Sequence, residues 1–458
     1  MLCALLWLSA GHAGALALPP QQGDFWLRFD ALPRLETAAA PLTDTLRFDS
    51  LSALTEHALR ERPESRAAWL AIQAEAARLD AAEAADWPTL TGQFSFTRSQ
   101  GLSSSGSSVP VLHRYGPNLS LSYLIYDFGA RAAGIEAQRY QLVSSLLDNN
   151  RTLQDVIVQV EAAYFSLLSA RALVEAQTEQ EAALRASLDA VEVRLRGGLA
   201  SRADQLRARA ALAEASLARQ AAGRDRAKAE AALKQAAGIA QTQNLALAWE
   251  TAPPPALDAS ILLADLLAEA ERQRPDLLSL QAAAARARAE AERARAARWP
   301  SLTFAANTGR TFFLEDDRTP STTYSAGVNV SIPLFDGGRL KSEARAAARD
   351  AERLQATAAT QREAVALAVA LAYQDLRHAQ AQREGVALQY DSASESAQAA
   401  QARYAAGVGS LLELLTAQAD LARARQVQAQ ADSDWQTAFS RLNHALGRLP
   451  LTTSQGKP

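Results

Sequence analysis

Cysteine is almost absent from this sequence. Cys3 is the only cysteine among 458 residues, and it lies in a short apolar run from Leu2 to Ala17. The run ends in a small-residue pattern, Ala-Leu-Ala, that is typical of a signal-peptide cleavage site, although no basic segment precedes it. We expect residues 1–17 to be removed on export; the alternative is a buried N-terminal helix. The exported chain would then have no disulfides and no cysteine metal ligands.

Basic charge is also limited. The net charge is -3, the isoelectric point is near 6.1, and only four of the 47 cationic residues are lysines. The most arginine-rich stretch, residues 285–298, contains interleaved glutamates, which favours a solvated, salt-bridged helix face over a basic patch. We therefore do not expect nucleic acid as a partner.

No catalytic or metal-binding pattern is present. The histidines beyond the N-terminal run do not have ligand spacing, and nucleophile-elbow, phosphate-loop and zinc-protease motifs are missing. These histidines are His57, His113, His378 and His444. The sequence therefore predicts neither an enzyme nor a cofactor.

After the N-terminal run, long apolar stretches are missing as well. No window holds the roughly 18 to 20 uninterrupted apolar residues that a membrane helix needs. If this protein spans a membrane, it must do so with strands.

The sequence does contain an internal duplication. Arg62-Pro63 returns as Arg274-Pro275 and Trp87-Pro88 as Trp299-Pro300, both at an offset of 212. A glycine junction returns at an offset of 208, Gly129 to Gly337, and the remaining landmarks return at 209. Landmarks in the same order show that two similar halves follow one another.

The duplication sets the expected organisation of the chain. A proline-rich linker, residues 241–259, separates the halves. We expect the other segments to be an extended N-terminal segment at 18–45, a first repeat at 46–240, a second repeat at 260–447 and a tail at 448–458.

Within each half, apolar residues step alternately by four and three. They run through Val156, Val160, Ala163, Leu167 and Ala170, and again through Val365, Val369, Ala372, Leu376 and Ala379. A mean spacing of 3.5 residues is the seam of a left-handed coiled coil. Helices of about 65 residues, roughly 100 Å long, are predicted at a rise of 1.5 Å per residue.

The segments between these helices follow a period of two. Apolar and polar residues alternate over about nine positions, which fits a membrane β-strand of roughly 9 to 11 residues. We expect strands at about 89–100, 115–127, 301–312 and 322–333. The alternative is an ordinary half-buried soluble sheet.

The flanks of these segments favour the membrane. Tryptophan is frequent at membrane interfaces, proline stops helices, and glycine permits the backbone redirection between strand and helix. Four strands cannot close a barrel, so the chain would pool its strands with copies of itself. The expected junction residues are Trp87, Pro88, Gly129, Trp299, Pro300, Pro333, Gly337 and Gly338.

Together, the repeated Arg-Pro helix starts, the two Trp-Pro motifs, LFDGGR at 334–339 and RYAAGVGSLLELLTAQADL at 403–421 resemble the TolC-like outer-membrane efflux protein family. The likeness covers nearly all of the chain after about residue 46. It implies a mixed α and β membrane protein, a homotrimer with a twelve-stranded β-barrel in the outer-membrane lipid, continuous with a periplasmic α-helical tunnel. It also implies that a periplasmic adaptor (membrane fusion) protein and an inner-membrane transporter supply the substrates.

The resemblance also assigns candidate sites. In the family, the far helix turns form the periplasmic entrance and the adaptor-docking surface. The matching residues here are Gly197, Gly198, Leu199, Ala200, Ser201, Gly407, Val408, Gly409 and Ser410. The glycines would equally serve as plain helix ends, and both roles are compatible.

Inside the entrance, the family often has acidic groups and a tyrosine-aspartate-arginine linkage that keeps the resting tube closed. Asp204, Tyr404 and Glu413 occupy matching positions, whereas Gly409 replaces the expected arginine and Thr416 a second acidic residue. A ring of three Glu413 side chains would attract cations. The alternative is a solvated surface carboxylate.

Two functions of different class follow. The first is a passive outer-membrane export duct of a tripartite efflux or type I secretion system. The second is a soluble periplasmic coiled-coil scaffold or adaptor. The paired strand segments favour the duct, because an adaptor would carry compact β-domains with soluble cores.

Overall fold

The computed structural model describes residues 45–100, 111–248, 262–314 and 318–448. The expected signal peptide, the extended segment up to residue 44, the first hairpin loop at 101–110 and the tail beyond Arg448 lie outside these residues.

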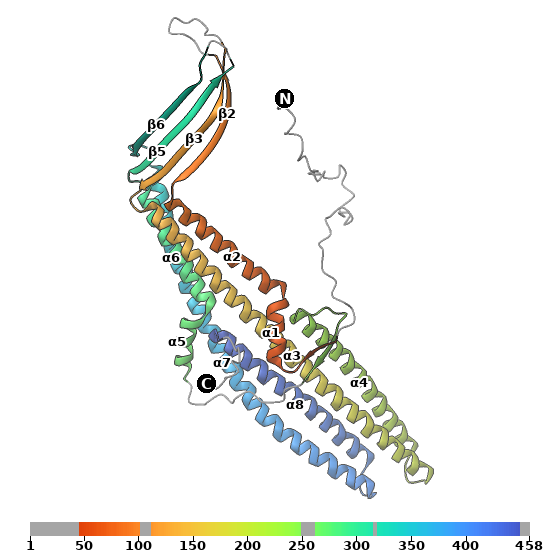
Figure 1. The fold of residues 1–458 in the computed structure, drawn as a ribbon. Helices are drawn as coiled ribbons and strands as arrows, with labels where there is room; N and C mark the ends of the chain where they lie inside the picture. The colour runs from red at the N-terminus through yellow and green to blue at the C-terminus, as the bar shows by residue number, and fades with distance from the viewer. Residues whose placement is uncertain (1–44, 101–110, 249–261, 315–317, 449–458) are drawn as a thin grey trace, which may run out of the picture. The chain divides into compact units, whose positions relative to one another are not determined.

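Each half supplies two short helices, a strand hairpin, and a long helix that turns back into a shorter one (Figure 1). The first half contains β1 (Thr45–Phe48), α1 (Leu51–Glu61), α2 (Pro63–Glu83), a 3-10 turn (Ala84–Asp86), β2 (Thr89–Ser99), β3 (Leu112–Tyr126), α3 (Ala130–Arg196) and α4 (Arg202–Ala236). After β4 (Asn244–Leu247), the second half contains α5 (Leu263–Gln273), α6 (Pro275–Ala296), β5 (Ser301–Phe313), β6 (Ser321–Ser331), α7 (Arg339–Ala405) and α8 (Leu411–Leu446). The helices α3 and α7 have 67 residues each, close to the predicted length.

Four strands form one antiparallel sheet in the order β2-β3-β5-β6. Each half contributes a hairpin, and β3 pairs with β5 to join the halves, with Leu121 opposite Ala306. Strand β3 begins three residues before the predicted start at 115, because residues 112–114 continue the ladder with β2. Strand β5 ends at Phe313, one residue beyond the predicted end at 312. The strands β2 and β6 are therefore the two edges of the sheet.

The register separates apolar and polar side chains onto the two faces of the sheet, because successive residues of a strand point to opposite faces. One row across the four strands is Leu90, Leu121, Ala306 and Ala326, and the next row is Thr91, Ser120, Asn307 and Ser325. A sheet with one apolar and one polar face suits a wall between lipid and water.

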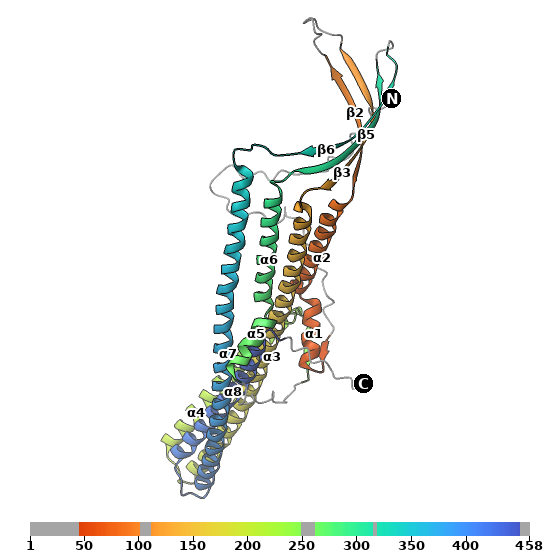
Figure 2. The ribbon, with the colours of Figure 1, turned by 90° about the vertical axis from the view of Figure 1, so that its left-hand side faces the viewer.

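The helices nearest the sheet repeat the order of its strands. Helix α2 packs on α3, α3 on α6, and α6 on α7, and Figure 2 shows these four side by side. Each of them is directly joined to one strand, α2 to β2, α3 to β3, α6 to β5 and α7 to β6. Farther from the sheet, α4 packs on α3, α3 on α8, and α8 on α7. The row is therefore bounded by α7 on one side and by α2 and then α4 on the other.

The predicted coiled-coil seam lies in the helical core. In α7, Val365, Val369 and Leu376 are buried in one cluster with α5, α6 and α8. In α3, Val156 and Val160 are buried in a second cluster with α1 and α4. The 3.5-residue spacing thus marks the contact face of both long helices.

The two strand-to-helix junctions share one design. Asp127 accepts hydrogen bonds from the backbone N–H groups two and four residues later, and Asp336 makes the same two bonds. Gly129 and Gly338, in left-handed conformations with φ of 91° and 87°, directly precede α3 and α7. These carboxylates satisfy N–H groups that a helix start leaves unpaired.

The shared geometry of the two junctions shows that the offset of 208 assigned to them from the sequence is wrong. Gly129 corresponds to Gly338, not to Gly337, so the offset is 209 instead of 208. Gly337, with φ of 69°, then corresponds to Phe128, with φ of 54°. A bulky residue with positive φ is rare. Comparison of the two halves by sequence therefore matched Gly129 with Gly337, although its structural equivalent is Gly338. Phe128 stacks on Trp299, with 5.8 Å between ring centroids.

The other expected junction residues lie at the same level. Trp87 follows the 3-10 turn after α2, and Trp299 follows α6; both rings are exposed in the single chain. Pro88 and Pro300 come directly before β2 and β5, and Pro333 follows β6.

The predicted linker at 241–259 contains a strand in its first part, and its residues from 249 onward lie outside the described residues. Asn244–Leu247 form strand β4, which pairs in parallel with β1, with Thr45 opposite Asn244. Leu245 and Leu247 pack against the α1 and α3 core. Apolar burial and ladder hydrogen bonds thus hold this part of the linker in a regular structure.

One helix in the described parts of the chain, α3, is long and apolar enough by composition to cross a membrane. Several of its apolar residues, among them Val156, Val160 and Leu167, are buried against other helices of the chain. Composition alone therefore does not make α3 a membrane span.

We expect Leu376→Ala to destabilise the helical core by about 2–5 kcal/mol, because it leaves a cavity at a fully buried position, where Leu376 is 0% exposed. The thermal unfolding of the helices in detergent, followed by circular dichroism, measures the change. Gln374→Ala, at an exposed position half a turn away, is the control. Equal midpoints for the two variants would contradict the assignment of the seam.

Candidate functional site

The two helix turns farthest from the sheet have the same backbone conformation. Gly198 and Gly407 are left-handed, with φ of 72° and 78°. The next residue in each turn donates its N–H to a carbonyl five residues back, Leu199 to Arg194 at 2.8 Å and Val408 to Arg403 at 3.0 Å. These bonds are the glycine-based ending of an α-helix. The glycines therefore have the structural role that was expected of them.

Each turn is followed by a serine that caps the returning helix. The Ser201 hydroxyl accepts from the N–H of Asp204 at 3.1 Å, and the Asp204 carboxylate accepts from the Ser201 hydroxyl at 2.6 Å and its N–H at 3.1 Å. This is a capping box. The Ser201 hydroxyl, followed by its backbone N–H, holds the pKa of Asp204 below its ordinary value, and Arg207 contributes further. Ser410 caps α8 by accepting from the N–H of Glu413 at 3.1 Å.

Glu413 has a cationic partner from the preceding helix. Its carboxylate lies 3.2 Å from Nε of Arg403, and both side chains are about half exposed. A Cβ at Gly409 would lie only 3.0 Å from the backbone nitrogen of Tyr404. The turn therefore has little room for a side chain at the position where the family resemblance expects an arginine, and Arg403 supplies the cation.

A second arginine, Arg194, links the two helix hairpins. Its guanidinium donates to the backbone carbonyls of Tyr404 at 2.5 Å and Ala405 at 3.1 Å. It also lies 4.1 Å from the centroid of the Tyr404 ring. The carbonyls at a helix C-terminus carry partial negative charge, so the arginine is favoured there. The contact ties the end of α3 to the end of α7.

Tyr404 itself is only 8% exposed. It packs with Val191 of α3, Ala208 of α4, and Leu411 and Leu414 of α8. The structure thus brings Tyr404 together with the helix that carries Glu413 and with the helix that carries Asp204. The hydrogen bonds described for the Asp204 carboxylate remain within its own helix start.

Sequence reasoning did not identify Arg194 and Arg403. They are repeat equivalents at an offset of 209, one residue before Leu195 and Tyr404. The repeated arginine was the available signal. The different partners of the two arginines depend on three-dimensional packing and were not readable from spacing.

The turns also expose apolar side chains. Leu199 is 82% exposed and Val408 72% exposed, and Leu412, the second residue of α8, is exposed as well. Exposed apolar residues at both turns favour binding of another protein at this end of the helices.

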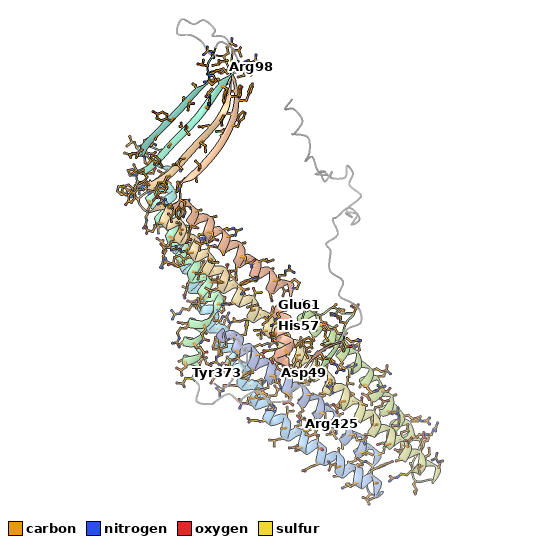
Figure 3. The ribbon with its side chains drawn as sticks, viewed as in Figure 1. Asp49, His57, Glu61, Arg98, Tyr373 and Arg425 are labelled. Carbon is orange, nitrogen blue, oxygen red and sulfur yellow. The ribbon has the colours of Figure 1, made fainter. Side chains whose placement is uncertain are left out.

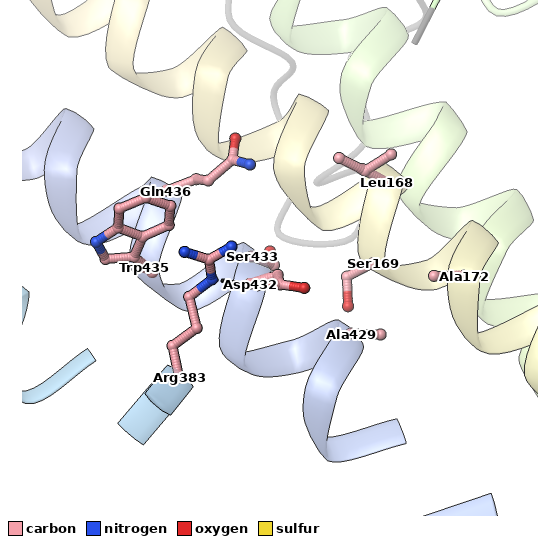
Figure 4. A pocket seen from close by; sticks show the side chains of 9 residues that line it. All are labelled: Leu168, Ser169, Ala172, Arg383, Ala429, Asp432, Ser433, Trp435 and Gln436. Atoms are coloured by element: carbon pink, nitrogen blue, oxygen red, sulfur yellow. Dashed lines mark hydrogen bonds and ion pairs between the residues drawn. The ribbon is translucent and has the colours of Figure 1, made fainter. Parts of the chain in front are cut away.

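A cavity of about 250 Å³ lies between α3 and α8 (Figure 4). Arg383 of α7 reaches it, with Nε 2.7 Å from Asp432 and the guanidinium 4.4 Å from the Trp435 ring centroid. The lining residues are Leu168, Ser169, Ala172, Arg383, Ala429, Asp432, Ser433, Trp435 and Gln436. Because Arg383 and Asp432 neutralise one another, the cavity offers no net charge for ligand selection.

In the described ranges, no three histidine, cysteine, aspartate or glutamate side chains form a group that could hold a metal ion. His444 pairs with Asp155 at 2.7 Å, and the ring of His57 lies 5.1 Å from that of Phe48. In Figure 3, His57 and Glu61 of α1 are labelled close to Asp49, whereas Arg98 is labelled at the far end of β2.

We expect Arg194→Ala to loosen the link between the two hairpins. Loss of the two charge-assisted hydrogen bonds should destabilise this end of the helices by about 1–3 kcal/mol. Amide hydrogen exchange in residues 400–414 should then accelerate by about fivefold or more, as mass spectrometry of peptides would measure. Arg196→Ala, exposed and two residues away, is the control. Equal exchange in the two variants would contradict the role of Arg194.

A family model described as "Outer membrane efflux protein" matches residues 54–239 and 266–448 of this chain. Protein CyaE of Bordetella pertussis is 31% identical over 448 residues, which is 97% of this chain and 92% of that protein. The alkaline protease secretion protein AprF of Pseudomonas aeruginosa is 28% identical over 343 residues, 73% of this chain and 70% of that protein.

Among solved structures, the transmembrane channel CusC has the same fold. Its TM-score is 0.76 at 22% sequence identity, with 88% of this chain and 94% of that chain covered. The family match extends over both halves, and it selects the export duct over the periplasmic scaffold. The chain therefore belongs to the outer membrane efflux protein family and is a TolC-like outer-membrane export channel, not an enzyme.

Proposed function

We propose that three copies of this chain form one passive export duct. Four strands from each copy would close a twelve-stranded barrel in the outer membrane, and the helices would continue it as a periplasmic tunnel. The observation that carries this proposal is the sheet, which has an apolar face, a polar face and two unpaired edges, β2 and β6.

Unpaired edges are incompatible with a single copy in lipid. Each backbone group without a hydrogen-bond partner costs several kcal/mol in hydrocarbon. Pairing the β6 edge of one copy with the β2 edge of the next removes these groups. The polar face, with Thr91, Ser120 and Asn307, would then line the water-filled interior.

The helix turns would face the partners. We assign residues 197–201 and 407–410 to docking of a periplasmic adaptor protein, because Leu199 and Val408 present apolar surface there. An inner-membrane transporter would supply the cargo through that adaptor, as in tripartite efflux or type I secretion. AprF, which is similar to this chain, is named for secretion of a protease.

Asp204, Tyr404 and Glu413 would lie at the periplasmic entrance. The described contacts support a closed end built on Arg194 and Tyr404, with Asp204 held in its capping box. Three copies of Glu413, each about half exposed beside Arg403, would surround the axis. Carboxylates gathered around a narrow opening attract cations.

The mass of the detergent-extracted protein tests the assembly. Light scattering, corrected for bound detergent, should give three copies in the outer-membrane fraction. A variant without residues 89–128, which lacks the first hairpin, should lose outer-membrane association, because the remaining strands cannot close a barrel. A water-soluble monomer or dimer of the full chain would contradict the proposal.

A further inference from the structure

The charged residues of the strands gather at one end of the sheet. The residues of β2, β3, β5 and β6 include arginines and one histidine, and none of them is an aspartate, a glutamate or a lysine. All of these cationic residues lie toward the strand ends that are remote from the helices, where Figure 3 marks Arg98. They are Arg98, His113, Arg114 and Arg310. The carboxylates that cap the helices, Asp127 and Asp336, lie at the opposite end of the sheet.

The strand register assigns the arginines to the two faces of the sheet. Successive residues of a strand point to opposite faces, and the apolar face carries the row from Leu90 to Ala326. Arg98 and Arg310 lie an even number of residues from the members of that row in β2 and β5, so they belong to the apolar face. Arg114 lies an odd number of residues from the member in β3 and belongs to the polar face.

Aromatic side chains form a row across three strands beside the two arginines of the apolar face. Phe96 lies opposite Tyr115, and Tyr115 lies opposite Phe312. The rings of Tyr115 and Phe312 stack with 5.5 Å between their centroids. The guanidinium of Arg310 lies 5.3 Å from the centroid of the Phe312 ring. Because Phe312 is two residues farther from the helices, the Arg310 side chain reaches outward along its strand. Arg98 follows Phe96 by two residues, so both arginines adjoin the aromatic row.

This aromatic row lies about one membrane thickness from the Trp-Pro junctions. Phe96 follows Trp87 by nine residues, which is about 30 Å along a strand at a rise of about 3.4 Å per residue. A strand tilted by about 35–45° then covers roughly 21–25 Å of membrane, close to the apolar band of about 25 Å in outer-membrane barrels. Aromatic residues mark both borders of such a band. Because the helices of this export channel are periplasmic, the row around Phe96 lies at the outer border.

Arginines on the lipid-facing surface need anions at the same level. Arginine is costly at the middle of a bilayer and is tolerated near its borders, where the long side chain extends to the headgroups. The described strands provide no carboxylate on either face. Residues 315–317, all acidic, follow β5 in the sequence and lie outside the described residues. The anions that the bilayer itself supplies at this level are the phosphates of its headgroups.

Building on the barrel of the proposed function, we propose that Arg98 and Arg310, with the aromatic row beside them, bind the phosphate groups of the glycolipid that forms the outer leaflet of the outer membrane. Guanidinium groups bind phosphate through paired, charge-assisted hydrogen bonds. The aromatic rings lie where the acyl chains of the same lipid meet its headgroup. The site holds the outer end of the barrel at the level of the headgroups.

The polar face provides a matched control at the same end of the sheet. Arg114 lies opposite Phe313, and its guanidinium donates to the Ser99 hydroxyl at 3.3 Å. In the barrel this arginine faces the interior and not the lipid. Loss of the Arg114 charge changes the net charge at this end as much as loss of the Arg98 charge does. It should nevertheless leave lipid binding unchanged.

Native mass spectrometry of the detergent-extracted, delipidated protein tests the site, with lipid A, the phosphorylated lipid part of lipopolysaccharide, as the probe. Arg98→Gln and Arg310→Gln should each weaken the binding of lipid A by about tenfold or more, because each removes charge-assisted hydrogen bonds. Arg114→Gln should bind lipid A as tightly as the unchanged protein does. Lipid A from which the phosphates have been removed should bind the unchanged protein by about tenfold or more less tightly.

Two results would overturn the phosphate site. The first is equal binding of lipid A by all three variants, and the second is equal binding of lipid A with and without its phosphates. Either result would mean that the barrel contacts its lipid through apolar surface alone. The comparison of the two lipids needs no substitution, so it decides the question even where a variant does not assemble.

The detergent-corrected mass, measured in parallel, separates the phosphate site from the duct. Weaker binding in Arg98→Gln and Arg310→Gln alone, at a mass of three copies, supports the site. Equal binding at that mass overturns the site and leaves the duct intact. A monomeric mass of the unchanged protein would overturn the duct and, with it, the placement of these arginines in the outer leaflet.

Discussion

Backbone hydrogen bonding in lipid is the constraint on which the rest of this structure depends. Hydrocarbon offers no water to unpaired N–H and C=O groups, so a membrane strand needs a partner on both sides. Within one chain, β3 and β5 have two partners, whereas β2 and β6 have one. Because each strand is directly joined to a helix, the strand order becomes the order of the helices, α2-α3-α6-α7.

The periodic elements of the fold were predictable because periodicity records which side of an element is covered. In α7, apolar residues such as Val369 and Leu376 belong to a pattern with a mean spacing of 3.5 residues, because one face of that helix is buried. Strand β4 carried no such signal, because four residues, Asn244–Leu247, are too few to show a period. Its order comes from pairing with β1, which is about 200 residues away in the sequence.

The junction shows a different limit. Positive φ is usually a property of glycine, so a sequence comparison pairs glycine with glycine. Here Phe128 occupies the position of Gly337, and stacking on Trp299 and on Tyr126 accompanies the strained backbone. Both halves share an aspartate that caps the helix, Asp127 in the first and Asp336 in the second. This aspartate is the better landmark for aligning the two halves, because its carboxylate binds the helix N–H groups.

At the far helix turns, residue types alone left two interpretations of Glu413, an acidic ring around the axis or a solvated surface carboxylate. Asp204 and Glu413 both stand three residues after a capping serine, where helix starts favour carboxylates irrespective of any channel. Their different surroundings come from the packing of the hairpins. Asp204 turns back to Ser201, whereas Glu413 meets Arg403.

The equal length of α3 and α7 follows from contacts at both of their ends. Their first residues are fixed by the sheet register, and their last residues are tied together by Arg194 and the Tyr404 carbonyl. At 1.5 Å per residue, an insertion of four residues in one helix would displace its turn by about 6 Å and break that link. Length differences between the halves are therefore confined to places without such a double constraint. The repeat offset is 212 between β2 and β5 and 209 between β3 and β6, so this length difference lies within the hairpins.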